Sequence, residues 1–177
     1  MKIAQSSQSE IEQVLSVERA AFNSDEEPQL VKALLSDPTA APVISLLAKD
    51  NEKAVGHILF TRAQLEPGST ASIYLLAPLA VVPEYQKKGI GGALIDTGLK
   101  ALRDTGCDLC FVLGHPGYYS RFGFTPAGRL GFDATYPVAE KNADAWMVYA
   151  LNPEMVDATS GRVVCADSLN RPEYWIE

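Results

Sequence analysis

The twelve residues PEYQKKGIGGAL, Pro83 to Leu94, constrain the fold more than any other part of the chain. They follow an apolar run suited to a strand, Ile73 to Val82, and they open a segment, Gly89 to Arg103, with helical spacing of its apolar residues. Glycines at a strand-to-helix turn let backbone N–H groups converge, and the helix N-terminus adds partial positive charge. The sequence therefore predicts a strand, a phosphate-binding loop and a helix in succession.

The residues around this loop exclude two common phosphate-binding motifs. A Walker loop needs Lys-Ser or Lys-Thr after its glycines, and neither follows here. A dinucleotide-binding turn needs a third glycine where Leu94 stands and an acid about 20 residues further on, where the sequence gives Phe111 to His115. Two alternatives remain: a tight turn with two solvated lysines, or a loop of the form Gln-x-x-Gly-x-Gly, spelled by Gln86 to Gly91.

The order of the predicted elements indicates a mixed α/β sandwich. We expect strands at 2–4, 43–49, 54–61, 73–82, 109–113 and 146–151, helices at 9–22, 26–35 and 89–103, and helical turns at 116–122. A right-handed crossover sets strand 109–113 parallel to strand 73–82. Proline is tolerated in strands at edges and bulges, so we expect the sheet to open near Pro78 and to form a slot between these two strands.

Composition limits the class of protein. The chain has 177 residues, 47% of them hydrophobic and 21% charged, which is usual for one globular domain. A net charge of -7 argues against a nucleic-acid partner, because such proteins need a basic face. The start, MKIAQSSQSE, lacks the apolar run of a signal peptide, and no apolar run is long enough to span a membrane. We therefore expect a cytoplasmic protein without a membrane partner.

The pair Cys107-x-x-Cys110 has the spacing of a redox or zinc motif. In a redox motif this pair opens a helix, whereas here it enters the strand-like run 109–113, in which residues three apart point to opposite faces. A zinc site needs about four ligands, and the sequence offers no second close pair. We expect ordinary core cysteines and no metal.

Two segments together carry a family resemblance. LAPLAVVPEYQKKGIGGALI contains the Gln-x-x-Gly-x-Gly loop, and VLGHPGYYSRFGF places a tyrosine shortly before a Gly-Phe pair. Through these landmarks the sequence, from its first helix to about Leu151, resembles a bacterial branch of predicted acetyltransferases in the GNAT superfamily of acyl-CoA-dependent N-acetyltransferases. The resemblance implies a GNAT-type fold, a single-domain mixed sheet flanked by helices, for residues 1–151. Residues 152–177 are expected to be a C-terminal extension packed on the same domain.

The resemblance also implies an activity and a cofactor site. The implied reaction moves an acetyl group from acetyl-CoA to a primary amine by direct attack, with a tyrosine general acid and no metal. Pantetheine would pair with the strand edge at Leu79, Ala80 and Val81. The pyrophosphate would bind the loop residues Lys87, Lys88, Gly89, Ile90, Gly91 and Gly92. The alternative function is a catalytically weak acyl-CoA-binding or sensing module.

The resemblance makes Tyr119 the general acid that protonates the leaving thiolate. The alternatives are Tyr118 in the same role, or a Tyr119 that only packs in an aromatic cluster. A free alkylamine is mostly charged at neutral pH, so some group must accept a proton before the amine attacks. The candidates for that group are His115, His57, Glu84, Asp25, Glu26 and Glu27. We place His115 first, because it follows the strand that should flank the thiol.

Three features of the protein stay open at this point. The small-molecule or peptide amine that accepts the acetyl group is not identified by any pattern in the sequence. The oligomeric state, including a homodimer, is open as well. An asparagine that the wider superfamily often has on the strand before the tyrosine helix is absent, and Val112 to His115 occupy that neighbourhood.

Overall fold

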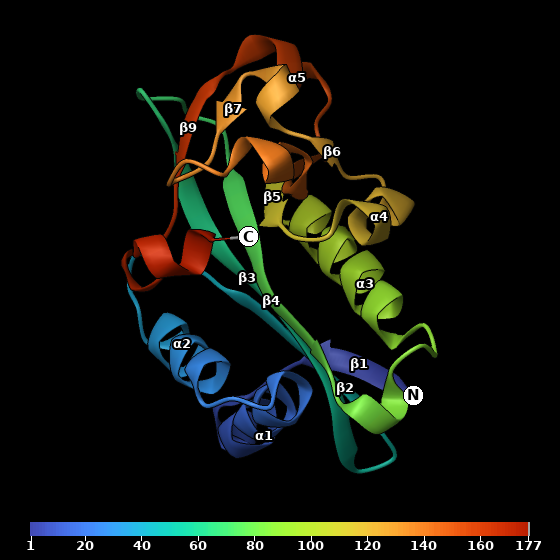
Figure 1. The fold of residues 1–177 in the computed structure, drawn as a ribbon. Helices are drawn as coiled ribbons and strands as arrows, with labels where there is room; N and C mark the ends of the chain where they lie inside the picture. The colour runs from blue at the N-terminus through green and yellow to red at the C-terminus, as the bar shows by residue number, and fades with distance from the viewer. Residues whose placement is uncertain (177) are drawn as a thin grey trace.

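A twisted mixed sheet runs through the molecule, and helices cover both of its faces (Figure 1). The computed structural model describes residues 1–176. The strands are β1 (Lys2–Gln5), β2 (Ile44–Asp50), β3 (Lys53–Glu66), β4 (Ile73–Val81), β5 (Leu109–Leu113), β6 (Thr125–Pro126), β7 (Phe132–Asp133), β8 (Trp146–Ala150) and β9 (Gly161–Val164). Their order across the sheet is β1-β2-β3-β4-β5-β8-β6, while β9 pairs with both β3 and β7. The predicted mixed α/β architecture is confirmed.

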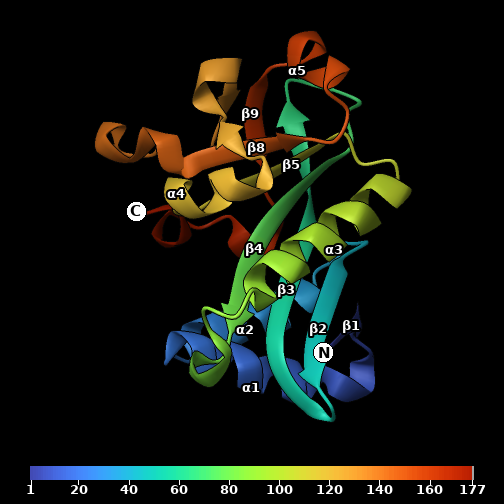
Figure 2. The ribbon, with the colours of Figure 1, turned by 90° about the vertical axis from the view of Figure 1, so that its right-hand side faces the viewer.

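The helices lie on opposite sides of the sheet. They are α1 (Ile11–Phe22), α2 (Glu26–Leu35), α3 (Ile90–Asp104), α4 (Pro116–Tyr119) and α5 (Glu154–Ala158). Figure 2 shows α3 in front of β3 and β4, with α1 and α2 behind these strands. Among residues 1–176, none of these helices combines the length and the apolar character that crossing a membrane requires.

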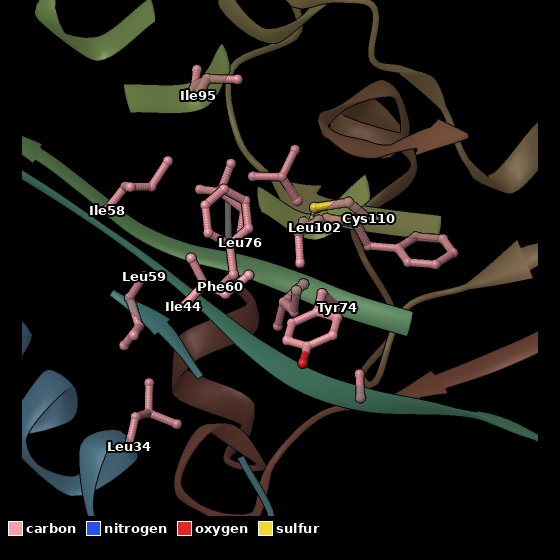
Figure 3. Close-up of a cluster of buried hydrophobic side chains, with 14 of the residues drawn as sticks. Leu34, Ile44, Ile58, Leu59, Phe60, Tyr74, Leu76, Ile95, Leu102 and Cys110 are labelled. Carbon is pink, nitrogen blue, oxygen red and sulfur yellow. Dashed lines mark hydrogen bonds between the residues drawn. The ribbon is translucent and has the colours of Figure 1, made fainter. Parts of the chain in front are cut away.

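Alternation along β3 divides the core into two layers. Because successive strand residues point to opposite faces, Leu59 and Phe60 must pack against different helices. Leu59 points toward Leu34 of α2, and Ile58 lies on the other side of the strands, with Ile95 of α3 (Figure 3). Phe60 packs on the same side as Ile58, against α3, where a side chain at Gly98 would meet its ring. All five of these side chains are completely buried.

The sheet opens in the middle of β4. Its parallel pairing with β5 ends at Leu75, which lies opposite Phe111, whereas its antiparallel pairing with β3 continues to Val81. The β3–β4 register shifts between Ile58 and Phe60, opposite the Ala77-Pro78 segment. This bulge at a proline is what the sequence predicted. It leaves residues 76–81 of β4 with one paired edge and one edge that faces away from β3.

Two parts of the fold differ from the prediction in extent. β3 runs to Glu66, five residues beyond the predicted end, because Gln64 to Glu66 pair with β9 from the C-terminal segment. The first helix is preceded by a 3-10 turn over Gln8–Glu10, in which Ser7 and Glu10 form a capping box. The C-terminal residues therefore add a strand to the sheet rather than forming a separate unit.

The C-terminal segment is also held by a carboxylate on the loop after α2. Asp37 accepts hydrogen bonds from the backbone N–H and the hydroxyl of Ser168, at 2.9 and 2.8 Å, and from Thr39. Partial burial raises the pKa of Asp37, but these hydrogen bonds outweigh it and lower the pKa to about 2. The charged carboxylate thus fastens residues 167–168 beside α2.

Candidate active site

A cavity of about 840 Å³ lies where β4 gives way to α3. One wall is the glycine-lysine loop and the first turn of α3, and the other comes from α4 and the turn after it. The lining residues are Val81, Tyr85, Gln86, Lys87, Gly89, Ile90, Gly91, Gly92, Ala93, Asp96, Tyr118, Arg121 and Phe122. The two sequence landmarks, far apart along the chain, therefore face each other across one cavity.

The backbone of the loop is shaped for an anion. Lys87 (φ 63°) and Gly89 (φ 84°) are left-handed, and the side-chain amide of Gln86 donates to the Val81 carbonyl at 3.0 Å. The N-terminal end of α3 has its first helical bond from the Ala93 N–H to the Gly89 carbonyl, at 3.0 Å. The N–H groups that precede Ala93 have no acceptor within the helix, so they are free to bind a ligand in the cavity.

Gly91 and Gly92 also make room for the opposite wall. A Cβ at Gly91 would meet the hydroxyl of Tyr118, and one at Gly92 would lie 2.8 Å from the Phe122 ring. The two rings pack on each other, with centroids 5.2 Å apart. The sequence explained these glycines by phosphate binding alone, and the structure adds close packing of the aromatic wall as a second reason.

The chain as a whole is acidic, so positive charge at the cavity has to come from side chains that lie close to it. Lys87 and Arg121 line the cavity together with one acid, Asp96. The guanidinium carbon of Arg121 lies 5.7 Å from the ring centroids of both Tyr118 and Phe122, which holds it at the wall. Arg121 belongs to this site although the sequence analysis did not select it. Its place within the tyrosine landmark was the available signal.

Lys88 is placed differently from its neighbour. Its Nζ lies 5.3 Å from the centroid of the Tyr85 ring, and it does not line the cavity. The Tyr85 hydroxyl donates to Asp50 at 2.9 Å, which anchors the ring on the β2–β3 turn. Of the two lysines in the predicted loop, only Lys87 is therefore positioned for direct contact with a ligand in this cavity.

Tyr118 and Tyr119 occupy different environments. Tyr118 lines the cavity, whereas Tyr119 is 9% exposed and packs edge-to-face on Tyr118 and Phe124. Its ring also lies against Gly114, where a Cβ would collide with it. Burial raises the pKa of Tyr119, so its phenol stays protonated throughout the physiological range.

His115 stands at the entry to α4 and is exposed. It is the N-cap residue of α4, two residues after the end of β5, and it is not among the residues that line the cavity. The structure therefore brings the loop residues together with Tyr118 and Arg121 and leaves His115 outside this group.

The strand residues selected from the sequence lie on the edge of β4 that turns away from β3. Leu79, Ala80 and Val81 pair with β3 on one side only, because the β5 ladder has already ended. The Leu79 side chain faces α3, 3.8 Å from a Cβ built on Gly91. Ala80 faces the opposite side, together with His57, its partner in the register.

A buried polar cluster lies on that opposite side, beneath α1. His57 Nδ1 is 2.6 Å from Glu18 Oε2, its Nε2 is 2.8 Å from Ser45 Oγ, and Ser45 Oγ is 2.7 Å from Ser6 Oγ. The sequence analysis named His57 only among the candidate proton acceptors, and it missed Glu18 and Ser45. The signal for Glu18 was its position on the apolar stripe of the first helix, where a carboxylate needs a buried partner.

The three cysteines are free and buried. Burial raises the pKa of the Cys107 thiol to about 12 and that of Cys110 well above its ordinary value. The residues that the structure describes contain no group of three or more histidine, cysteine or acidic side chains placed to hold a metal ion. These thiols are core residues of low reactivity.

Comparison with known proteins places this geometry in a family. The family model described as "Acetyltransferase (GNAT) domain" matches residues 2–127. An uncharacterized N-acetyltransferase of Escherichia coli K12, YjhQ, is 47% identical over 161 residues, which cover 90% of this chain and 88% of YjhQ. Another, YhbS of the same organism, is 30% identical and covers 86% of this chain and 89% of its own length.

Solved structures agree in fold. The crystal structure of E. coli YhbS in complex with CoA has a TM-score of 0.87 at 27% identity, covering 96% of this chain and 92% of its own. A GNAT acetyltransferase of Brucella melitensis in complex with acetyl-CoA has a TM-score of 0.76 at 28% identity, covering 95% and 97%. From its loop, its open β4 and these relatives, the chain belongs to the GNAT acetyltransferase family.

Proposed function

We propose that this protein transfers an acetyl group from acetyl-CoA to a primary amine by direct attack of the amine. One observation carries the proposal: the edge of β4 that turns away from β3 at residues 76–81 runs straight into the cavity at the N-terminus of α3. Such an edge offers unpaired backbone groups to an extended ligand, and the helix N-terminus offers N–H groups to a phosphate. The two relatives that were crystallised with CoA or acetyl-CoA support this assignment.

The residues of this chain fit the parts of acetyl-CoA. Leu79, Ala80 and Val81 would pair with the amides of the pantetheine arm, which is extended and alternates donors and acceptors. The loop from Lys87 to Gly92 would hold the pyrophosphate, with Lys87 and Arg121 supplying opposite charge from the two walls of the cavity. Lys88, which stacks on Tyr85, would act on the phosphates through its charge at longer range.

When bound, acetyl-CoA supplies the thioester carbonyl that the amine attacks and a thiolate as the leaving group. Tyr119 is the proposed donor to that sulfur, because burial keeps its phenol protonated and packing on Gly114 and Phe124 fixes its ring. Tyr118 is the alternative donor, since it lines the cavity. A phenol with a raised pKa is a weak acid, so its contribution should lie near the lower limit for general acids.

The attacking amine needs a proton acceptor. His115 was the first candidate from the sequence, and its exposed position at the entry to α4 would let it exchange protons directly with water. Three free cysteines suit a reducing compartment, which supports the cytoplasm as the place of the reaction.

The experiment is a CoA-release assay across a panel of primary amines, in which the free thiol of CoA is detected chemically. We expect release that depends on both the amine and the enzyme, and acetyl-CoA binding that calorimetry detects without any amine. A sensing module would bind acetyl-CoA and release no CoA with any amine of the panel, and that result would replace the proposed transferase by the binding module.

A further inference from the structure

The cavity at the start of α3 is larger than a pyrophosphate needs. Its volume is about 840 Å³, which lies in the range of sites that enclose a whole drug-sized ligand. The loop and the first turn of α3 form one end of this cavity. At the other end the lining continues along α3 to Asp96 and across to Arg121 and Phe122. This second end therefore has room for a further part of the ligand.

The order of the parts of acetyl-CoA identifies which part this is. Pantetheine, pyrophosphate and the 3′-phosphoadenosine group follow one another along the molecule. With pantetheine on residues 79–81 of β4 and the pyrophosphate at the loop, the adenosine group is the part that lies beyond the loop. The inference thus rests on the proposed placement of acetyl-CoA, and it assigns the second end of the cavity to adenosine.

Asp96 lies at this second end. It stands four positions after Gly92 on α3, so both residues are on the same face of the helix. The Phe122 ring lies against that face, 2.8 Å from a Cβ built on Gly92. Asp96 is exposed, and its carboxylate has no hydrogen bond or ion pair to any of residues 1–176. It is therefore available to accept a hydrogen bond from a ligand beside Phe122.

A carboxylate is an unfavourable group in a cavity for a polyanion. The pyrophosphate and the 3′-phosphate of CoA are negative, and Asp96 reduces the positive charge that Lys87 and Arg121 bring to the cavity. A hydrogen bond from the ligand to this carboxylate would offset the repulsion, because bonds to an ionised acceptor are roughly twice as strong as neutral ones. The useful question is which donor of adenosine reaches it.

Adenosine in CoA has two kinds of donor, the ribose 2′-hydroxyl and the exocyclic amine of adenine. The hydroxyl is next to the 3′-phosphate, so a contact with it would bring Asp96 close to a phosphate dianion. The amine is at the end of adenosine that lies farthest from all phosphates. Like charges are therefore kept farthest apart when Asp96 accepts from the amine.

The opposite wall is suited to the flat face of a base. The ring centroids of Tyr118 and Phe122 lie 5.2 Å apart, and the guanidinium carbon of Arg121 lies 5.7 Å from each of them. Aromatic rings and guanidinium planes both stack on nucleobases. A base on the Phe122 ring would face Asp96, because that ring packs on the α3 face that carries Asp96.

We propose that Asp96 and Phe122 form the adenine site for acetyl-CoA, in which the base stacks on Phe122 and its exocyclic amine donates to the Asp96 carboxylate. Asp96 is then a specificity-determining residue that selects adenine among bases of the same shape. Both residues act on cofactor binding and not on the transfer step. Their replacement should therefore raise the KM for acetyl-CoA and leave kcat at saturating acetyl-CoA unchanged.

The test compares acetyl-CoA with an analogue in which purine replaces adenine. Purine keeps the shape and the stacking face of the base and lacks only the amine, while the ribose, the phosphates and pantetheine are the same. We expect calorimetry to show that the wild type binds acetyl-CoA about tenfold more tightly than the analogue. This is near the lower limit for a hydrogen bond to a charged group, because the cavity is open to solvent.

The variant Asp96→Ala should lose this preference, so that its affinities for the two cofactors differ by about twofold or less. Truncation also removes the repulsion between the carboxylate and the phosphates. The purine analogue should therefore bind at least as tightly to Asp96→Ala as it does to the wild type, with a smaller gain at high salt. Opposite effects on the two cofactors would be specific to a contact with the amine.

Asp104→Ala is the matched control for charge. Asp104 is the last residue of α3, about 12 Å further along the helix than Asp96, and it does not line the cavity. Its replacement removes the same negative charge from the same helix. We expect it to change the two affinities by one and the same small factor and to keep the tenfold preference for adenine.

Phe122→Leu tests the stacking surface. Leucine keeps an apolar side chain over Gly92 and removes the ring face. We expect both cofactors to bind about fivefold more weakly, near the lower limit for stacking of one base on an aromatic side chain. Because the Asp96 contact remains, the preference for adenine over purine should survive in this variant.

Three results would overturn the adenine site: equal wild-type affinities for the two cofactors, a preference for adenine that survives in Asp96→Ala, or unchanged affinities in Phe122→Leu. Each of them leaves acetyl transfer intact, because the CoA-release assay measures transfer separately. Absence of CoA release with every amine, together with a preference for adenine that depends on Asp96, would replace the transferase by the binding module and support the adenine site. A wild type that binds neither cofactor would overturn both proposals.

Discussion

The two faces of β4 are built in opposite ways. On the α3 face, residues 86–92 form a loop whose backbone geometry makes the site, and residues 118–122 supply a wall that is also contiguous in sequence. On the α1 face, Glu18 and His57 are 39 positions apart, and their buried contact exists only because the sheet and α1 bring the two side chains to 2.6 Å. The first face is open to solvent, and the second is buried.

This difference predicts different responses to mutation. A site made from backbone N–H groups keeps most of its function when a single side chain is changed, because the helix N-terminus and the loop conformation remain. A site made from a few buried side chains depends on each of them, since removing one leaves its partner unsatisfied. Cofactor affinity should thus be spread over many residues, whereas the chemical step should depend on single groups.

The largest effect on the chemical step is expected for Tyr119. Tyr119→Phe keeps the ring that packs on Gly114 and Phe124 and removes only the hydroxyl. We expect kcat to fall about 100-fold with little change in acetyl-CoA affinity. Because burial raises the pKa of Tyr119, the phenol is protonated at every pH from 6 to 9, and the ratio to wild type should be constant across this range.

Tyr118→Phe is the matched control for this change. Its hydroxyl lies over Gly91 on the cavity wall, so its loss should leave kcat near the wild-type value. If steady-state kinetics give the reverse pattern, with Tyr118→Phe slow and Tyr119→Phe normal, the donor is Tyr118 and Tyr119 is a packing residue. Equal, small effects would assign the proton to solvent.

Gly91 allows a sharper test of why the loop is rich in glycine. Its Cβ position is blocked by the Tyr118 hydroxyl, so Gly91→Ala should push the aromatic wall outward and weaken acetyl-CoA binding by about tenfold, or about 1.4 kcal/mol. In the Tyr118→Phe background the nearest ring atom, at the Cζ position, is 3.6 Å away, which is an ordinary contact. The double variant should then recover both affinity and stability.

Wild type, Gly91→Ala, Tyr118→Phe and the double variant form a double-mutant cycle. Acetyl-CoA affinities measured by calorimetry for these four proteins decide between two roles of Gly91. Recovery in the double variant means that Gly91 is needed for packing of Tyr118. Affinity that stays low in the double variant, in a protein that is as stable as wild type, means that phosphate itself requires the space at Gly91. Alanine is favoured over glycine inside a helix by roughly 1 kcal/mol, so the double variant should also be slightly more stable than Tyr118→Phe.

The α3 face could be predicted from the sequence because its signals are local. One stretch of sequence contains the glycines, the strand before them and the helical spacing after them. Pro78 within that strand predicted the bulge that opens the sheet. The parallel strand 109–113 followed from the handedness of a single crossover. These inferences need only neighbouring residues and general rules of chain geometry.

The rest depends on contacts between distant residues. No sequence signal near Gln64 to Glu66 predicts that pairing with β9 will lengthen β3. The buried Ala63 and Leu65 do alternate with polar neighbours past the predicted end of β3. Glu18 lies on the apolar stripe of the first helix, but its partner His57 is 39 positions away, so only the fold identifies the pair. Which of two adjacent tyrosines lines the cavity depends on the rotation of α4, a short helix whose four residues carry no periodic signal.

Smaller effects are expected from the charges on the α3 face. Lys87→Gln and Arg121→Gln each remove one exposed cation from the cavity, and solvent-exposed charge pairs contribute roughly 0.2–1 kcal/mol. We expect each change to weaken acetyl-CoA binding up to about fivefold, with less difference from wild type at high salt, as screening predicts. Lys88→Gln, which lies outside the cavity lining, is the control and should change affinity least.

Two results from calorimetry in low and high salt would contradict the prediction that the charges on the α3 face contribute little to acetyl-CoA affinity. A hundredfold loss of acetyl-CoA affinity in Lys87→Gln or Arg121→Gln would mean that side-chain charge, and not the backbone of the loop, dominates phosphate binding. A loss for Lys88→Gln that equals the loss for Lys87→Gln would mean that the loop rearranges on binding, so that both lysines contact the phosphates.

The smallest effect on activity is expected for the cysteines, which belong to neither face of β4. Cys107 and Cys110 are buried at the start of β5, where their thiols are held protonated by burial and where Cys107 contacts the carbonyl of Leu109 at 3.4 Å. Replacing both by alanine removes two small buried groups, so the free energy of unfolding should fall by about 1–3 kcal/mol. Because the strand that they support pairs with β4 only up to Leu75, the β4 segment at 76–81 and both faces of β4 should keep their geometry.

We therefore expect the variant in which both cysteines are alanine to have wild-type kcat and acetyl-CoA affinity in a protein of lower stability, measured below its unfolding temperature. Loss of transfer in a folded variant that still binds acetyl-CoA would show that β5 positions a reacting group, and the comparison between the two faces of β4 would then have to include its open edge as a third region.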